Sequence, residues 1–372
     1  MPGKAAIRAE AARLQALLAD AVGGARAIEA DILQPAETLL DLYGEDIRAR
    51  AYVTADPVRG ERVLRPDFTV PVVQMHMESG AEPARYTYAG EVFRRQESPE
   101  PGRPAEYLQV GLEVFDRADP AARDAEVFCA IAGAVAPLGL RAAMGDTGLL
   151  SAAVSGLSLS APRRAALMRH LWRPQRFRAL LERYAGRRAA PPGRAALLER
   201  LATQGAEALI DEAGPLVGRR SRAEIAARLE ALAADAGEPP LPDRELELID
   251  DLLAVRAAPP DALSHLSDLA VDLPALEPAL DRLSARLDAL AARGVDLGAV
   301  AFEASFGRTT LEYYDGFVFG FVAETRPGLP PVATGGRYDA LTRQLGAGRE
   351  IPAVGGVIRP ALVLELREGA GC

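Results

Sequence analysis

The feature that most constrains this chain is the strict alternation of apolar and polar residues at positions 108–115. Because successive side chains of a β-strand point to opposite faces, this alternation predicts a strand with two unlike faces. One face carries Leu108, Val110, Leu112 and Val114, and the other carries Gln109, Gly111 and Glu113. The glycine leaves space between an amide and a carboxylate that lie about 13 Å apart along the strand. We therefore predict that the polar face lines a pocket instead of meeting open solvent.

Three more polar side chains are placed to join that pocket. Asp67 and Thr69 are two residues apart, so they can share a face, and Arg94 ends a second alternating run. Together with the amide and the carboxylate of the strand, they offer acids, a hydroxyl and one guanidinium. This set matches a small zwitterion, because an ammonium group needs acceptors and a carboxylate needs a cation.

Each of these residues also has a plainer interpretation. Glu113 could be an ordinary polar residue on a solvated strand, and Arg94 could form a surface ion pair worth about 0–1 kcal/mol. Tyr313 and Tyr314 point to opposite faces of the strand expected at 310–322, so one of them would pack in the core. The pair at 335–336 is typical of a tight glycine turn, which could also form a wall of the pocket.

Composition narrows the class of protein. With 372 residues, 49% of them hydrophobic and 26% charged, the chain is long enough for two globular domains. The net charge of −9 argues against a nucleic-acid binder, which usually has a basic face. Cys129 and Cys372 lack metal-type spacing and the three histidines are scattered, so we predict no metal site and a reducing cytoplasm. We also see no run long enough to span a membrane and no signal-peptide pattern.

The composition changes along the chain after about residue 155. Beyond this point Ala, Leu and Arg recur with helical periodicity, broken by Pro and Gly. Strand character returns at 299–306 and 310–322. We predict an α+β domain, formed by residues 1–155 and 297–372, that is interrupted by a helical insertion at 156–296.

Five ordered segments carry a resemblance to a known family. They are Leu64-Arg65-Pro66-Asp67-Phe68-Thr69, Phe93-Arg94, residues 109–115, Leu311-Glu312-Tyr313-Tyr314 and Gly335-Gly336-Arg337-Tyr338-Asp339. In this order they resemble the catalytic domain of histidyl-tRNA synthetases. The resemblance implies the class II aminoacyl-tRNA synthetase fold, an antiparallel sheet with flanking helices. It covers about 1–150 and 297–366, while the helical middle corresponds only in position to the insertion domain of that family.

The chain departs from the synthetase pattern where ATP and the amino-acid carboxylate would bind. Thr309 stands in the place of a histidine-specific arginine, with Arg308 one residue away. Leu362 stands in the place of the third-motif arginine, with Arg359 three residues early, and Ala-Glu at 105–106 replaces another arginine. Cations that clamp a polyphosphate stabilise charge at the reacting centre, and their loss costs orders of magnitude in rate. The sequence also ends soon after the third motif, so we expect no anticodon-binding domain.

A chain that retains the amino-acid pocket but lacks the ATP-binding arginines resembles the regulatory subunits of ATP phosphoribosyltransferase, which are paralogues of the synthetases. This resemblance implies a partner, the short-form catalytic subunit, in a hetero-octamer of four regulatory and four catalytic chains. It implies a role in the first step of histidine biosynthesis, needed for activity and for histidine feedback, without catalysis, cofactor or tRNA. Class II domains dimerise near their first motif, here residues 25–35, so we expect a homodimer core.

The resemblance also assigns the pocket to histidine. Glu113 and Tyr314 would hold the imidazole ring. Asp67, Thr69 and Gln109 would hold the amino group.

The rest of the histidine site would be lined by Arg94 and Tyr338. With Thr309 in place of the expected arginine, the histidine carboxylate would be held by Arg94 or Arg308. The sequence leaves open whether histidine binds in this pocket or at the interface with the catalytic subunit, and which surface meets that subunit. Two alternatives remain: a histidyl-tRNA synthetase or its relic, and a free-standing amino-acid-binding protein.

Overall fold

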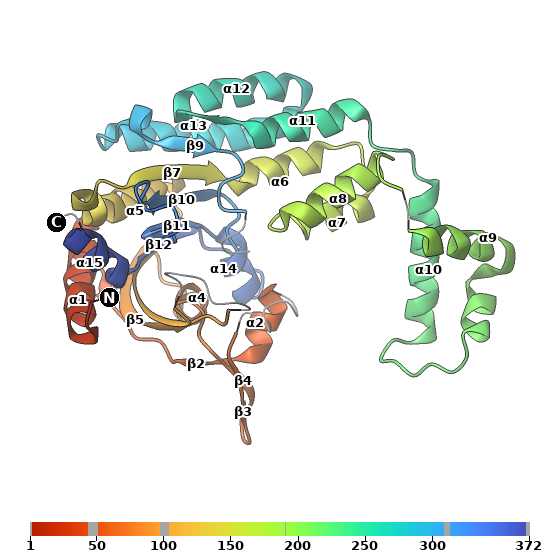
Figure 1. The fold of residues 1–372 in the computed structure, drawn as a ribbon, viewed down its shortest axis with the longest axis horizontal. Helices are drawn as coiled ribbons and strands as arrows, with labels where there is room; N and C mark the ends of the chain where they lie inside the picture. The colour runs from red at the N-terminus through yellow and green to blue at the C-terminus, as the bar shows by residue number, and fades with distance from the viewer. Residues whose placement is uncertain (1, 44–50, 97–103, 190, 309–312, 370–372) are drawn as a thin grey trace. The chain divides into compact units, whose positions relative to one another are not determined.

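The computed structural model describes residues 2–43, 51–96, 104–189, 191–308 and 313–369 (Figure 1). The chain forms two compact units. The first comprises Met1–Ala152 and Leu252–Cys372, and the second comprises Ala153–Asp251. None of the described helices combines the length and the apolar character that a membrane span requires.

The first unit is built on a nine-stranded sheet, counted over the described residues, in the order β1-β5-β6-β12-β11-β10-β7-β9-β8. Its strands are β1 (Arg26–Ala27), β5 (Ala84–Phe93), β6 (Glu106–Phe115), β7 (Arg141–Asp146), β8 (Arg256–Ala257), β9 (Ala301–Glu303), β10 (Phe317–Val322), β11 (Ala333–Arg337) and β12 (Ala353–Ile358). The β1–β5 and β7–β9 pairs are parallel, and the other neighbours are antiparallel. The predicted α+β fold with a mainly antiparallel sheet is therefore confirmed.

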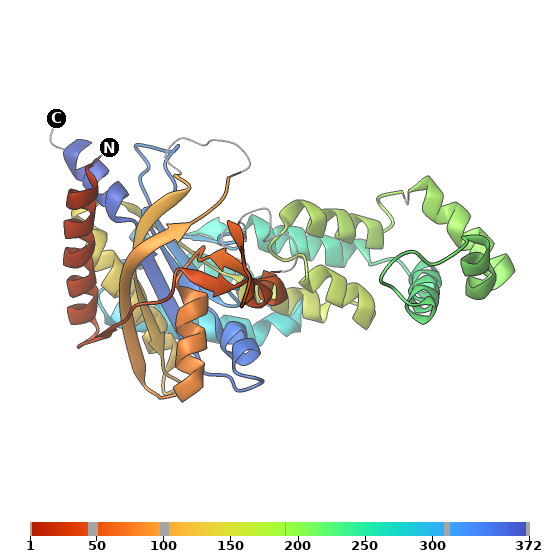
Figure 2. The ribbon, with the colours of Figure 1, turned by 90° about the horizontal axis from the view of Figure 1, so that it is seen from below.

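Helices cover both faces of this sheet. The helices of the first unit are α1 (Lys4–Ala21), α2 (Ala36–Tyr43), α4 (Thr69–Ser79), α5 (Pro120–Val135), α12 (Pro259–Asp272), α13 (Glu277–Ala292), α14 (Asp339–Leu345) and α15 (Pro360–Gly369). Helices α1, α5 and α15 contact β6, whose apolar residues Val110, Leu112 and Val114 are fully buried. Figure 2 shows α1 on one side of β5 and α4 on the other. A small separate sheet is formed by β2 (Leu33–Pro35), β4 (Gly60–Leu64) and β3 (Val53–Asp56).

The second unit is helical, as the Ala-, Leu- and Arg-rich composition predicts. It contains α7 (Ala161–Met168), α8 (Pro174–Tyr184), α9 (Pro192–Glu212) and α10 (Arg222–Gly237), while α6 (Thr147–Gly156) and α11 (Asp243–Ala254) cross the boundary between the units. Helix α10 starts with a capping box, in which Ser221 and Glu224 exchange hydrogen bonds with each other's backbone.

The boundary of the insertion differs from the predicted one. Residues 252–296 were expected in the helical insertion but fold with the first unit. Helix α13 packs on α5, and its Arg286 forms ion pairs with Asp124 of α5 and Asp146 of β7. Helical periodicity alone cannot reveal this, because it does not say which neighbour a helix packs against.

Candidate functional site

Strand register brings the predicted polar residues to one face of the sheet. Glu113 of β6 lies opposite Tyr86 of β5 and Gly355 of β12, and Gly355 lies opposite Gly336 of β11. Residues paired across neighbouring strands project to the same side. The alternation predicted for residues 108–115 is thus present, with its apolar side facing α1, α5 and α15 and its polar side on the face that meets the start of α4.

Glu113 is the centre of this polar face. Its side chain is fully buried, and its Oε1 accepts hydrogen bonds from Thr69 Oγ1 at 2.9 Å and from the Tyr88 hydroxyl at 2.8 Å. Its Oε2 accepts a hydrogen bond from the Tyr338 hydroxyl. Burial raises the pKa of Glu113 to about 7, although the three hydroxyl donors act in the opposite direction. A carboxylate can accept about four hydrogen bonds, so this one can still take another donor.

Two predicted residues reach the site from the start of α4. Thr69 is the first residue of the helix, and Phe68 occupies the N-cap position. The Thr69 hydroxyl donates to the Glu113 carboxylate. Asp67 accepts the backbone N–H of Val70 at 3.3 Å. Burial raises the pKa of Asp67, and the charge of Arg94 opposes this shift.

Arg94 and Gln109 lie at the other end of the polar face. Arg94 Nε donates to the carbonyl oxygen of Pro66 at 2.9 Å, and its guanidinium lies 5.7 Å from the centroid of the Tyr107 ring. Gln109 is 1% exposed, and its Oε1 has no hydrogen-bond partner among the described residues. A buried acceptor without a donor costs about 1–3 kcal/mol, so this oxygen is suited to receive a ligand N–H.

Both tyrosines of the pair at 313–314 face the site. They are buried, and their ring centroids are 4.8 Å apart. The Tyr313 hydroxyl donates to Thr69 Oγ1 at 3.2 Å, while burial and the charge of Glu113 raise the pKa of Tyr314. Both tyrosines belong to the buried core cluster on this side of the sheet, so core packing is observed, whereas the opposite faces predicted for the pair are not. The strand β10 begins only at Phe317, so alternation does not apply to the residues before it.

Three glycines make space for the large side chains of the site. A Cβ at Gly111 would lie 2.3 Å from the Tyr88 ring, one at Gly336 2.7 Å from the Tyr314 ring, and one at Gly355 1.5 Å from Glu113 Oε2. The expected tight turn at 335–336 was wrong, because these residues lie inside strand β11. They are glycines because Phe319 and Tyr314 occupy the space above them.

We expect Gly355→Ala to lower the free energy of unfolding by about 1–3 kcal/mol, because the new methyl group would displace the Glu113 carboxylate from its hydroxyl donors. The measurement is urea unfolding followed by circular dichroism. The matched control is Gly133→Ala on an exposed face of α5, where a Cβ would meet nothing within 4 Å. Equal stability of Gly355→Ala and the wild type would contradict the packing described above.

Sequence reasoning missed two residues of the site, Tyr88 and Tyr313. The position of Tyr88 follows from its pairing with Gly111 across β5 and β6. An aromatic residue opposite a glycine is a signal, but reading it requires the strand register.

The structure describes most of the residues at which the chain departs from the synthetase pattern. Thr309 lies outside the described residues. Arg308 is buried, and burial lowers its pKa to about 10. Leu362 is buried in α15, and the Arg359 guanidinium lies 5.2 Å from the Tyr107 ring centroid. Glu106 begins β6.

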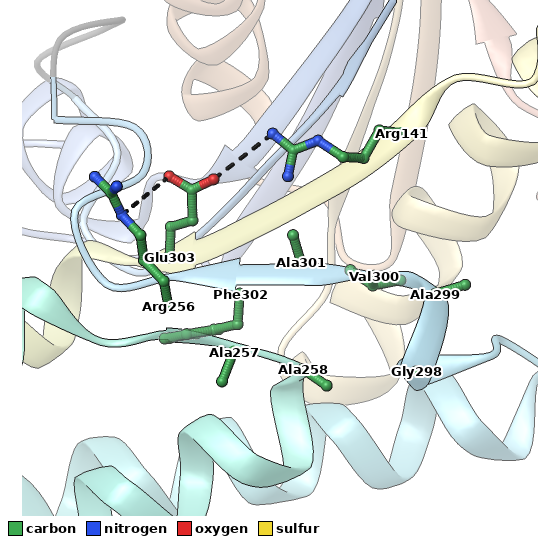
Figure 3. Close-up of a pocket in the computed structure, with 10 residues that line it drawn as sticks. All are labelled: Arg141, Arg256, Ala257, Ala258, Gly298, Ala299, Val300, Ala301, Phe302 and Glu303. Atoms are coloured by element: carbon green, nitrogen blue, oxygen red, sulfur yellow. Dashed lines mark ion pairs between the residues drawn. The ribbon is translucent and has the colours of Figure 1, made fainter. Parts of the chain in front are cut away.

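A separate pocket of about 370 Å³ lies at the far edge of the sheet (Figure 3). It is lined by residues 256–258 and 298–303 together with Arg141. Glu303 stands between two arginines, 3.7 Å from Arg141 Nη2 and 3.9 Å from Arg256 Nε. Strands β12, β11 and β10 separate this edge from Glu113. The pocket therefore shares no residue with the predicted site. Within the described residues, no cluster of His, Cys, Asp and Glu could hold a metal ion.

The chain is similar to two kinds of known protein. A sequence profile for histidyl-tRNA synthetase matches residues 2–258 and 236–361. A protein named ATP phosphoribosyltransferase regulatory subunit from Agrobacterium fabrum is 35% identical over 343 residues, covering 88% of this chain and 89% of that protein. One of the same name from Rhizobium rhizogenes is 34% identical over 346 residues, covering 88% of this chain and 90% of that protein.

The fold also has relatives among solved structures. One is described as an ATP phosphoribosyltransferase regulatory subunit/histidyl-tRNA synthetase from Bacillus halodurans, with a TM-score of 0.65 and 21% identity. The similarity covers 96% of this chain and 79% of that one. At this identity the comparison concerns the fold alone, and it confirms the predicted class II synthetase-like architecture.

Proposed function

The chain belongs to the histidyl-tRNA synthetase family and, within it, to the regulatory subunits of ATP phosphoribosyltransferase, and we propose that it conveys histidine feedback to a short-form catalytic subunit. In this proposal the chain activates that subunit in the first step of histidine biosynthesis. Histidine binds to the face of the sheet around Glu113, and the chain performs no phosphoribosyl transfer itself.

The observation that carries the proposal is the buried Gln109 amide oxygen without a donor, at the end of a face that also holds two buried carboxyl groups. A histidine ammonium group supplies three N–H donors, which suits Gln109 Oε1 and Asp67. The imidazole N–H suits the remaining acceptor position of Glu113. The donors of the ligand and the acceptors of the site therefore match in kind.

For the histidine carboxylate we propose Arg94. Its guanidinium is anchored at the Pro66 carbonyl, and its charge acts on buried Asp67. A cation beside the acid that receives the ammonium group is placed to hold the two charged ends of one amino acid. Tyr314 and Tyr338 would line the remaining walls around the ring.

We further propose a cytoplasmic hetero-octamer of four regulatory and four catalytic chains around a homodimer of this chain. The relatives' name, which includes a catalytic activity and a regulatory role, supports a catalytic partner. Sedimentation of the isolated chain as a monomer at micromolar concentration would argue against the homodimer.

The experiment is a reconstitution. The purified chain is mixed with the short-form catalytic subunit from the same genome, and phosphoribosyl transfer to ATP is followed while histidine is titrated. We expect activity well above that of the catalytic subunit alone, and suppression of this activity by histidine. If the mixture behaves like the catalytic subunit alone, the proposal fails.

A synthetase activity is the second candidate, since the matching sequence profile carries the synthetase name. Histidine-dependent exchange between ATP and pyrophosphate tests it on the same preparation. We expect no exchange, because Leu362 and Glu106 stand where cations for the polyphosphate would be needed.

A further inference from the structure

Asp315 links two segments of the Glu113 site by hydrogen bonds: the segment with Tyr313 and Tyr314, and the segment with Tyr338. It directly follows Tyr313 and Tyr314 in the chain. Its Oδ1 accepts the backbone N–H of Asp339 at 3.0 Å, and its Oδ2 accepts that of Ala340. These two residues begin α14 and directly follow Tyr338, whose hydroxyl donates to Glu113.

The backbone around Asp315 is held from two further sides. The Asp315 N–H donates to the carbonyl oxygen of Arg337 at 3.1 Å. The Thr147 hydroxyl donates to the carbonyl oxygens of Tyr314 at 3.0 Å and Gly316 at 3.2 Å. The segment 313–316 is therefore bound to β11 and α14 on one side and to the start of α6 on the other.

This arrangement is maintained at an electrostatic cost. Burial, together with the neighbouring Asp339 carboxylate, raises the pKa of Asp315 to about 7, against the effect of the two N–H donors. The Asp339 carboxylate in turn accepts hydrogen bonds from Arg337 Nη1 at 3.0 Å and from the N–H of Ala353 at 2.8 Å. The Asp315 carboxyl therefore accepts both backbone N–H groups although burial and a neighbouring carboxylate disfavour its charged form.

We propose that Asp315 is a positioning residue for the histidine site, which sets the distance between the Tyr313–Tyr314 segment and Tyr338 without touching the ligand itself. The inference rests on the proposed function, because it assumes that histidine binds around Glu113. It goes beyond that function by placing a determinant of affinity outside the residues that contact histidine.

The test is isothermal titration of histidine into the full-length chain with Asp315→Asn and Asp315→Ala. Asparagine keeps one acceptor oxygen, and alanine keeps none. We expect dissociation constants that rise about threefold for Asp315→Asn and about tenfold or more for Asp315→Ala. Both are measured well below the melting temperature of each variant, so that the folded protein alone is compared.

The matched control is Asp296→Ala. Asp296 also accepts a backbone N–H at the start of a short helix, that of Gly298 at 2.9 Å, but it lies outside the site. We expect this variant to lose stability and to keep the wild-type affinity for histidine. If the Asp315 variants lower only the melting temperature and bind histidine normally, Asp315 is merely structural and the proposal is overturned. If the wild type itself binds no histidine, it is the proposed function that fails.

Discussion

Replacing Glu113 with glutamine will weaken histidine binding by about 100-fold or more, since a charge-assisted hydrogen bond in a buried site contributes up to about 3 kcal/mol. The substitution preserves shape, and an amide oxygen can still accept from Thr69 and Tyr88, which both donate to Oε1. The fold should therefore persist while the negative acceptor for the imidazole N–H is lost. Isothermal titration measures the affinity, and the reconstituted mixture should keep its activity but lose suppression by histidine.

Glu126→Gln is the matched control for this experiment. Glu126 is also a buried glutamate, and it pairs with Arg85 at 3.0 Å away from the site. We expect wild-type affinity for histidine in this variant. Normal binding by Glu113→Gln would remove Glu113 from the site, whatever the outcome of the reconstitution.

Glu113→Gln should also change how the free energy of unfolding depends on pH. The pKa of Glu113 is raised in the fold from 4.5 to about 7, so burial favours the protonated form. This contribution to stability is complete below pH about 4.5 and is lost as pH rises through about 7. Its full size is on the order of 3 kcal/mol. Between pH 5 and 8 the wild type should lose stability relative to Glu113→Gln, as measured by urea unfolding. Parallel curves of unfolding free energy against pH would contradict the raised pKa of Glu113.

Replacing Arg286 with methionine will lower the free energy of unfolding of the first unit by about 3–5 kcal/mol, because it leaves buried carboxylates without a partner. Arg286 lies 2.8 Å from Asp124 Oδ2 and 2.7 Å from Asp146 Oδ2, and the exposed fractions of the three side chains are 3%, 2% and 4%. Asp124 keeps Arg337 at 2.7 Å, so Asp146 loses most. Methionine fills much of the vacated volume, which limits the cost of a cavity.

Arg282→Met on the exposed side of the same helix is the control, and we expect less than about 0.5 kcal/mol there. Unfolding is followed by circular dichroism, because the single tryptophan, Trp172, lies in the second unit. Similar stabilities of the two variants would show that the buried network contributes little.

Several features were determined by the local sequence alone. Alternation placed Gln109 and Glu113 on one face and Val110 and Val114 on the other, and the register of β6 agrees with this. The reason is that side-chain direction in a strand depends only on local backbone geometry. The same local rule predicted opposite faces for Tyr313 and Tyr314, but these residues precede strand β10 and both face the site.

Tertiary structure decided which groups meet. The hydroxyl of Tyr88 reaches Glu113 because β5 pairs with β6 in one particular register. Gly336 lies in a strand beneath Tyr314 instead of forming a turn, and α13 joins the sheet unit through Arg286. Each of these depends on contacts between segments far apart in the chain. Sequence periodicity predicts the direction of a side chain, whereas strand order and helix packing determine which residues that side chain contacts.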